Sequence, residues 1–172
     1  DTNGNIIMEF PRKGIMQVGN VHEGAVLVMY KNKLDQGKFK LLDLEGNIIA
    51  EEFDGLTNLN KNITFYAIKD NETLQWGVMN IHGTKITAPK FNNVISNLND
   101  SYGVSIIDEK GNEKWGFIDE KGEYILEPSY DSIGTYDGMV AMKTGSKLLW
   151  GIVNPYGEYI LDCKYEAAYS LE

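Results

Sequence analysis

A pattern of apolar and polar positions recurs three times along the chain, beginning at Trp76, Trp115 and Trp150. Each Trp is followed by Gly, by two apolar residues and then by Asp or Asn. A second Gly stands seven positions after the Trp, and an aromatic residue stands fifteen positions after it. The Trp residues lie 39 and 35 residues apart, and a nearly fixed period of this length is typical of solenoids, propellers and other arrays. The sequence therefore predicts a repeat protein.

The pattern divides the chain into five stretches of one array that covers residues 1–172. Three stretches are regular (75–107, 114–143 and 149–172), one is divergent (38–69) and one is partial (1–30). In the divergent stretch Phe39-Lys40 replaces Trp-Gly, and the aromatic Phe53 comes one position early. The chain begins without Met and inside a repeat, because residues 3–7 (NGNII) parallel residues 45–49 (EGNII). We therefore expect the array to be excised from a longer protein.

Within a repeat, the turn residues predict a meander of three strands. Asp119-Glu120-Lys121-Gly122 places Asp at the start of a type I turn and Gly where a positive φ is needed, which suits a hairpin with a Gly bulge. The strands of this repeat are expected at residues 103–107, 114–118 and 123–126. Pro128 is expected to end the third strand, because proline has no N–H to donate to a sheet. No stretch shows sustained helical spacing of apolar residues.

The Trp-Gly pair requires its own explanation, because glycine weakens a strand unless another group must approach its backbone closely. We expect a large aromatic ring, that of Phe91, Tyr130 or Tyr165, to pack over the glycine. The Trp side chains are expected in the core, since each repeat must bury its apolar face against its neighbours. The alternative is that the Trp side chains form a ligand-binding platform.

These elements predict an all-β fold built as a tandem array of three-stranded β-meander repeats. An open, solenoid-like array is favoured, and a small or incomplete β-propeller is the alternative.

Charge and composition narrow the possible functions. The net charge of −9 argues against binding to nucleic acid or to an anionic membrane surface. No run of 18 apolar residues is present, so membrane insertion by this fragment is not expected. His22, His82 and Cys163 are too few and too scattered to predict a Cys-His nucleophile or a zinc site. We therefore predict no enzyme activity, no catalytic residues, no cofactor and no metal.

The segment WGFIDEKGEYILEPSYD, preceded by a Tyr/His-Asp/Glu-Gly-apolar segment, closely resembles the WG-containing β-repeat family (WG or KWG repeats), which is found mainly in bacteria. The resemblance covers nearly the whole chain, with departures at Phe39-Lys40, Asn62 and Cys163. It implies a non-enzymatic repeat module, often part of a larger surface or accessory protein, and hence an extracellular or cell-surface location. It supplies no functional residues that can be carried over.

Two functions follow as hypotheses: a protein-interaction scaffold, and, as the alternative, a carbohydrate or cell-wall binding module. Aromatics flanked by carboxylates and amides in one groove would favour sugars, whereas an apolar patch with a polar rim would favour a protein partner. We expect function in the variable segments between framework positions, namely residues 58–62, 97–102, 132–136 and 165–169. Tyr102 and Tyr136 are the ligand-binding candidates, and both are expected to be exposed.

Overall fold

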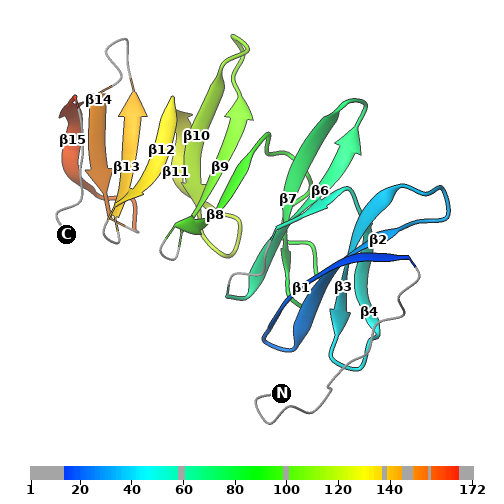
Figure 1. Ribbon diagram of the computed structural model, residues 1–172. Coiled ribbons are helices and arrows are strands. Elements are labelled where there is room, and N and C mark those ends of the chain that lie inside the picture. The colour runs from blue at the N-terminus through cyan, green and yellow to red at the C-terminus, as the bar shows by residue number, and fades with distance from the viewer. Residues whose placement is uncertain are drawn as a thin grey trace. The chain divides into compact units, whose positions relative to one another are not determined.

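A computed structural model of the chain describes residues 14–57, 61–98, 101–136, 139–144, 149–154 and 156–166, without the side chains of residues 20, 96–98, 135–136 and 139–144. Every helix or strand assigned within these residues is a β-strand, so the all-β class is confirmed (Figure 1). The chain forms two compact units, Asp1–Pro89 and Lys90–Glu172.

The first unit contains two antiparallel sheets, with strand orders β1-β2-β3-β4 and β5-β6-β7. The bounds are β1 Ile15–His22, β2 Ala25–Lys31, β3 Gly37–Asp43, β4 Ile48–Phe53, β5 Gly55–Leu56, β6 Ile63–Asp70 and β7 Thr73–Asn80. The second unit contains two more antiparallel sheets, with orders β8-β9-β10-β11 and β12-β13-β14-β15. Their bounds are β8 Val94–Leu98, β9 Ser101–Ile107, β10 Glu113–Ile118, β11 Tyr124–Tyr130, β12 Ser132–Tyr136, β13 Met139–Thr144, β14 Leu149–Val153 and β15 Tyr159–Tyr165.

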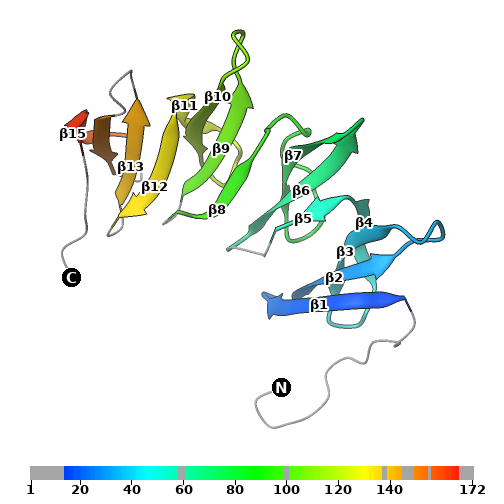
Figure 2. The ribbon, with the colours of Figure 1, turned by 45° about the horizontal axis from the view of Figure 1, so that its top comes forward.

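Each sheet is one repeat, and successive strands lie side by side as in a meander (Figure 2). The predicted tandem array of β-meander repeats is therefore confirmed, but three of the four sheets have four strands and not three. The strands missed by the sequence are β1, β5, β8 and β12, each of which pairs with the apolar strand after it. In the second repeat the strand expected after Gly83 is absent from the described residues, apart from one bridge between Met79 and Lys85. Residues 132–136, predicted as a loop, are the whole of β12.

The turns after the Trp strands have the predicted form. In the turn between β10 and β11, Asp119 Oδ1 accepts the backbone N–H groups of Lys121 (2.9 Å) and Glu123 (3.0 Å). The N–H of Gly122 donates to the Asp119 carbonyl (3.0 Å), and Gly122 has φ +76°. Asn80 and Asn154 accept the N–H groups two and four positions ahead in the same way. Asp or Asn is thus required because its side chain satisfies two N–H groups of the turn.

The glycine of Trp-Gly is covered mainly by backbone, and the prediction of a covering ring from Phe91, Tyr130 or Tyr165 is wrong. Trp115 pairs with Tyr130 and Phe117 with Leu126, so β11 bulges opposite Gly116. A Cβ on Gly116 would lie 2.7 Å from Pro128 N and against the Leu126 carbonyl. Pro128 therefore does not end the third strand; it lies in the bulge, where no ladder hydrogen bond is lost.

The equivalent glycines share this close approach. A Cβ on Gly151 would lie 2.8 Å from the backbone N of Cys163, which stands where Pro128 stands in the preceding repeat. At Gly77 an aromatic ring does contribute, but it is that of Tyr66, the cross-strand partner, together with the Thr87 carbonyl, both at 2.8 Å.

The divergent first repeat lacks this glycine, and its last strand is changed accordingly. Lys40 stands at the glycine position of β3, where Phe39 pairs with Phe53 and Leu41 with Ala50. The bulge of β4 is thus one residue shorter than that of β11. The early arrival of Phe53 in the sequence is explained, because a residue with a side chain leaves less room for the opposite strand to bulge over it.

The core runs through both sheets of each unit. In the first unit it contains Ala25, Leu27, Leu41, Phe53, Leu56, Tyr66 and Met79, and in the second it includes Phe117, Tyr130 and Val153. Trp76, Trp115 and Trp150 are only half-buried. The expectation of Trp side chains in the core is therefore met in part.

Candidate functional site

The scattered His and Cys residues remain apart in the structure. His22 Nε2 lies 3.0 Å from the Lys61 carbonyl, and His82 is exposed in a turn. Burial raises the pKa of the Cys163 thiol, which disfavours the reactive thiolate. Among the described residues, no three His, Cys, Asp or Glu side chains come together as metal ligands would. A search of the same residues finds no helix that could span a membrane.

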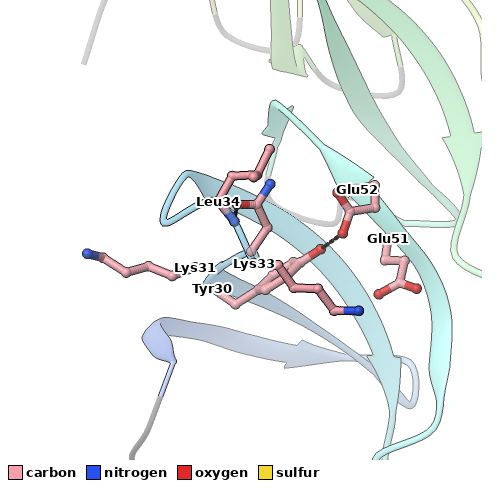
Figure 3. Close-up of a pocket in the computed structure, with 7 residues that line it drawn as sticks. Tyr30, Lys31, Lys33, Leu34, Glu51 and Glu52 are labelled. Carbon is pink, nitrogen blue, oxygen red and sulfur yellow. Dashed lines mark hydrogen bonds between the residues drawn. The ribbon is translucent and has the colours of Figure 1, made fainter.

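An open, polar hollow of about 500 Å³ lies beside Tyr30, between the β2–β3 hairpin and the bulge of β4 (Figure 3). The Tyr30 hydroxyl donates to Glu52 Oε1 (2.6 Å), and burial together with this bond raises the pKa of Tyr30, so the hydroxyl stays protonated. Lys40 Nζ lies 4.9 Å from the centroid of the Tyr30 ring. The lining is completed by the polar side chains of Lys31, Asn32, Lys33 and Glu51 and by the apolar Leu34. The hollow offers hydrogen-bonding groups, but one face of its only aromatic ring is already covered by an ammonium group.

A second feature is a contact that joins the two repeats of each compact unit. A Cβ on Gly83, in the turn after β7, would lie 2.9 Å from the carbonyl of Ile49 in β4 and 3.0 Å from its Cγ2. A Cβ on Gly157, in the turn after β14, would lie 2.8 Å from the carbonyl of Ile125 in β11 and 3.0 Å from its Cγ2. The turn of one repeat thus lies directly on the last strand of the repeat before it, and only glycine fits at this position of the turn.

The second half of this contact is made by the residue two positions after the turn glycine. Its side chain lies against the aromatic residue that ends the preceding repeat. Lys85 Nζ lies 5.8 Å from the Phe53 ring centroid, and the Tyr159 hydroxyl bonds to that of Tyr130. Phe53 and Tyr130 are both buried, Tyr130 at 7% exposure. An isoleucine and an aromatic on the last strand of a repeat therefore form one acceptor surface for the next repeat.

The last strand, β15, carries the same two side chains, and no other described repeat covers them, although Lys164 Nζ lies 5.8 Å from the Tyr165 ring centroid. Ile160 corresponds to Ile49 and Ile125, and Tyr165 corresponds to Phe53 and Tyr130. Ile160 is 50% exposed and Tyr165 is 42% exposed. Among the described strands, β15 pairs only with β14 and forms the edge of its sheet (Figure 1). We call Ile160 and Tyr165 the β15 surface; exposed Glu158, Asp162, Lys164 and Glu166 border it.

The residues singled out from the sequence lie elsewhere. The prediction that Tyr102 is exposed in a loop is wrong, because it lies in β9 and is 1% exposed. Tyr136 ends β12, and its side chain lies outside the described residues. Of the other variable segments, residues 58–60, 99–100 and 167–169 also lie outside them. The two candidate tyrosines belong to different sheets, on β9 and β12.

Sequence reasoning missed the β15 surface because it assigned the distal aromatic to the framework alone. No signal in the sequence separates Tyr165 from the other framework aromatics, and its exposure comes from the structure.

A comparison with known families agrees with these repeats. Residues 115–147 and 150–172 match the family model described as WG containing repeat. No curated protein matches the chain significantly. The family resemblance drawn from the sequence is thus confirmed for residues 115–147 and 150–172, which are similar to the WG containing repeat family.

Proposed function

We propose that the chain is a non-enzymatic repeat module that binds a protein partner through the β15 surface. One observation carries the proposal: the side chains equivalent to Ile160 and Tyr165 are covered by another repeat in both compact units, whereas these two are exposed. Exposed apolar side chains bordered by charged ones are characteristic of protein-binding surfaces.

The charges of the chain support a protein partner over other macromolecules. With a net charge of −9, the chain is poorly suited to bind the phosphates of nucleic acid or an anionic bilayer. Tyr165 also supplies a stiff aromatic anchor, the kind of side chain that contributes most to binding energy at interfaces.

Carbohydrate binding is the second candidate, and the hollow beside Tyr30 favours it. There an aromatic ring lies next to Glu51, Glu52 and Asn32, a combination able to hydrogen-bond hydroxyl groups. This candidate is weaker, because Lys40 covers one face of the ring on which a sugar would stack and Glu52 already engages the hydroxyl.

Parallel affinity capture tests the proposal. The wild type, Ile160→Asp and the control Ile107→Asp, which changes an exposed apolar residue at the end of β9, are immobilised and exposed to purified polysaccharides and to cell extract. We expect proteins that bind to the wild type and to Ile107→Asp but not to Ile160→Asp. Equal protein capture by all three, or saturable binding of polysaccharide alone, would contradict the proposal.

A further inference from the structure

We propose that the partner of the β15 surface is the Asp43–Gly46 turn of a second copy of this chain, so that copies associate head to tail. This inference rests on the proposed function and names the partner of the same surface. It is drawn from the repeat-to-repeat contact, which has two complementary halves.

The first half, the acceptor, is the isoleucine and the aromatic of a last strand. In the first unit it is Ile49 and Phe53, which receive the turn of Gly83, and in the second it is Ile125 and Tyr130, which receive the turn of Gly157. The β15 surface repeats this pair. β15 also bulges in the same way as β11, since Trp150 pairs with Tyr165 as Trp115 pairs with Tyr130. It therefore has the side chains to receive another turn of this kind.

The second half, the donor, is a turn with glycine at positive φ and a contacting side chain two positions later. The turn between β3 and β4 has this form: Gly46 has φ +85°, and Asp43 Oδ1 accepts the N–H of Asn47 (2.7 Å). No described atom lies within 4 Å of a Cβ built on Gly46, unlike Gly83 and Gly157.

Ile48 completes this free donor. It stands two positions after Gly46, where Lys85 and Tyr159 stand in other repeats, and it is 52% exposed. An isoleucine at this point offers an apolar side chain to pack against the ring of Tyr165. One chain thus carries both an unoccupied donor and an unoccupied acceptor among its described residues.

The two surfaces differ, so the contact between copies is heterologous and leads to open chains of copies unless the chain closes on itself. It involves one turn and one strand, which places it among small, weak interfaces. Each copy carries a net charge of −9, so copies repel one another and added salt should strengthen the association by screening.

Sedimentation velocity tests the inference with the full chain from about 10 μM to 1 mM, a range suited to weak association, in low and in high salt. We expect reversible oligomers of the wild type that grow with concentration and with salt. Ile48→Asp removes the donor and Ile160→Asp removes the acceptor, and each should weaken self-association about tenfold or more. The matched control, Leu34→Asp, should associate like the wild type.

Mixing the two defective variants gives the sharpest result. Ile160→Asp keeps its donor and Ile48→Asp keeps its acceptor, so the mixture should form a one-to-one complex that does not grow further. Melting temperatures verify that each variant is folded, and Tyr165→Ser replaces Ile160→Asp if that variant is not.

Three results would overturn the inference: a wild type that stays monomeric throughout, variants that associate like the wild type, or a mixture that remains monomeric. A monomeric wild type would mean that the donor or the acceptor is not available to a second copy. If Ile160-dependent capture of a different protein persists in that case, the proposed function stands and only the identity of the partner is wrong. If that capture is lost as well, both proposals fail.

Discussion

Gly116 lies where the backbone of β11 bulges across β10, and this explains why glycine recurs after Trp. The Glu127 carbonyl carbon would lie 2.9 Å from a Cβ at this position, and the nitrogen of Pro128 would be closer still. Backbone atoms cannot turn aside as a side chain can, so any larger residue forces the bulge to move. Strand propensity alone would favour replacing this glycine.

Replacing Gly116 by Ala should therefore lower the free energy of unfolding by about 1–3 kcal/mol, the usual effect of overpacking. Gly134 in β12 provides the control, because no atom of the described residues lies within 4 Å of a Cβ built there. Gly134→Ala should change stability by no more than about 0.5 kcal/mol. Urea unfolding of both variants measures the difference, and equal stability of Gly116→Ala and the wild type would refute the close approach.

Tyr102 offers a second test at this scale, because the sequence and the structure predict opposite results for it. An exposed loop tyrosine can be replaced with little effect, whereas Tyr102 is 1% exposed in β9. Tyr102→Ser should cost about 3–5 kcal/mol, as for other large buried aromatics. Tyr156→Ser, at an exposed turn position, should stay within about 0.5 kcal/mol of the wild type. Thermal unfolding that ranks the two variants the other way would contradict the burial of Tyr102.

At the scale of single elements, the turns were predictable and the first strand of each repeat was not. A turn such as that of Asp119 is local: one side chain satisfies nearby N–H groups, and one glycine supplies the positive φ. The strand β12, in contrast, contains Gly134 between Ile133 and Thr135 and shows no clear alternation. It is a strand because it pairs with β13, and the residues of one strand do not by themselves determine which strand it pairs with.

A pairing signal between elements was nevertheless present in the repeats. In the first and third repeats, the residue before the Trp position and the residue after the distal aromatic carry opposite charges: Lys38 Nζ bonds Asp54 Oδ1 (2.6 Å), and Lys114 bonds Asp131. In the second repeat the same two positions hold the neutral residues Gln75 and Asn92. Comparing the repeats position by position would have predicted that these residues meet.

The start of β10 predicts a dependence of stability on pH. Glu113 Oε1 accepts hydrogen bonds from Asn93 Nδ2 (2.6 Å), Ser105 Oγ (2.7 Å) and Asn92 Nδ2 (3.1 Å). These bonds, that from Asn93 foremost, hold the pKa of Glu113 below its usual value in the folded protein. Because its pKa is lower in the folded than in the unfolded chain, Glu113 stabilises the fold above its unfolded pKa, and this contribution is lost as the pH falls through the folded value.

Glu113→Gln should therefore reduce stability at neutral pH and flatten the loss of stability between about pH 5 and pH 3, near the usual range of glutamate titration. Glu109→Gln, in the exposed β9–β10 turn, provides the control and should follow the wild type. Urea unfolding across this pH range measures both curves. A curve for Glu113→Gln that is parallel to that of the wild type would contradict the role given to these hydrogen bonds.

For the whole molecule, the repeat pattern specified the all-β array, but the candidate site required the structure. The period indicates that repeats stack, since a repeat with one apolar face must bury it. It does not say which side chains receive the next repeat. That assignment came from two contacts, Gly83 on Ile49 and Gly157 on Ile125, whose equivalent on β15 is exposed.

The most direct test of the β15 surface places the photo-crosslinking residue p-benzoylphenylalanine at position 165, where it replaces one exposed aromatic with another. The same residue at position 156, exposed but outside the β15 surface, is the control. On irradiation, position 165 should cross-link to protein much more than position 156, and in the purified chain the product should map to residues 43–48 of a second copy. Equal yields from both positions, or no protein cross-link from position 165 in either purified chain or cell extract, would contradict the claim that β15 presents a protein-binding surface.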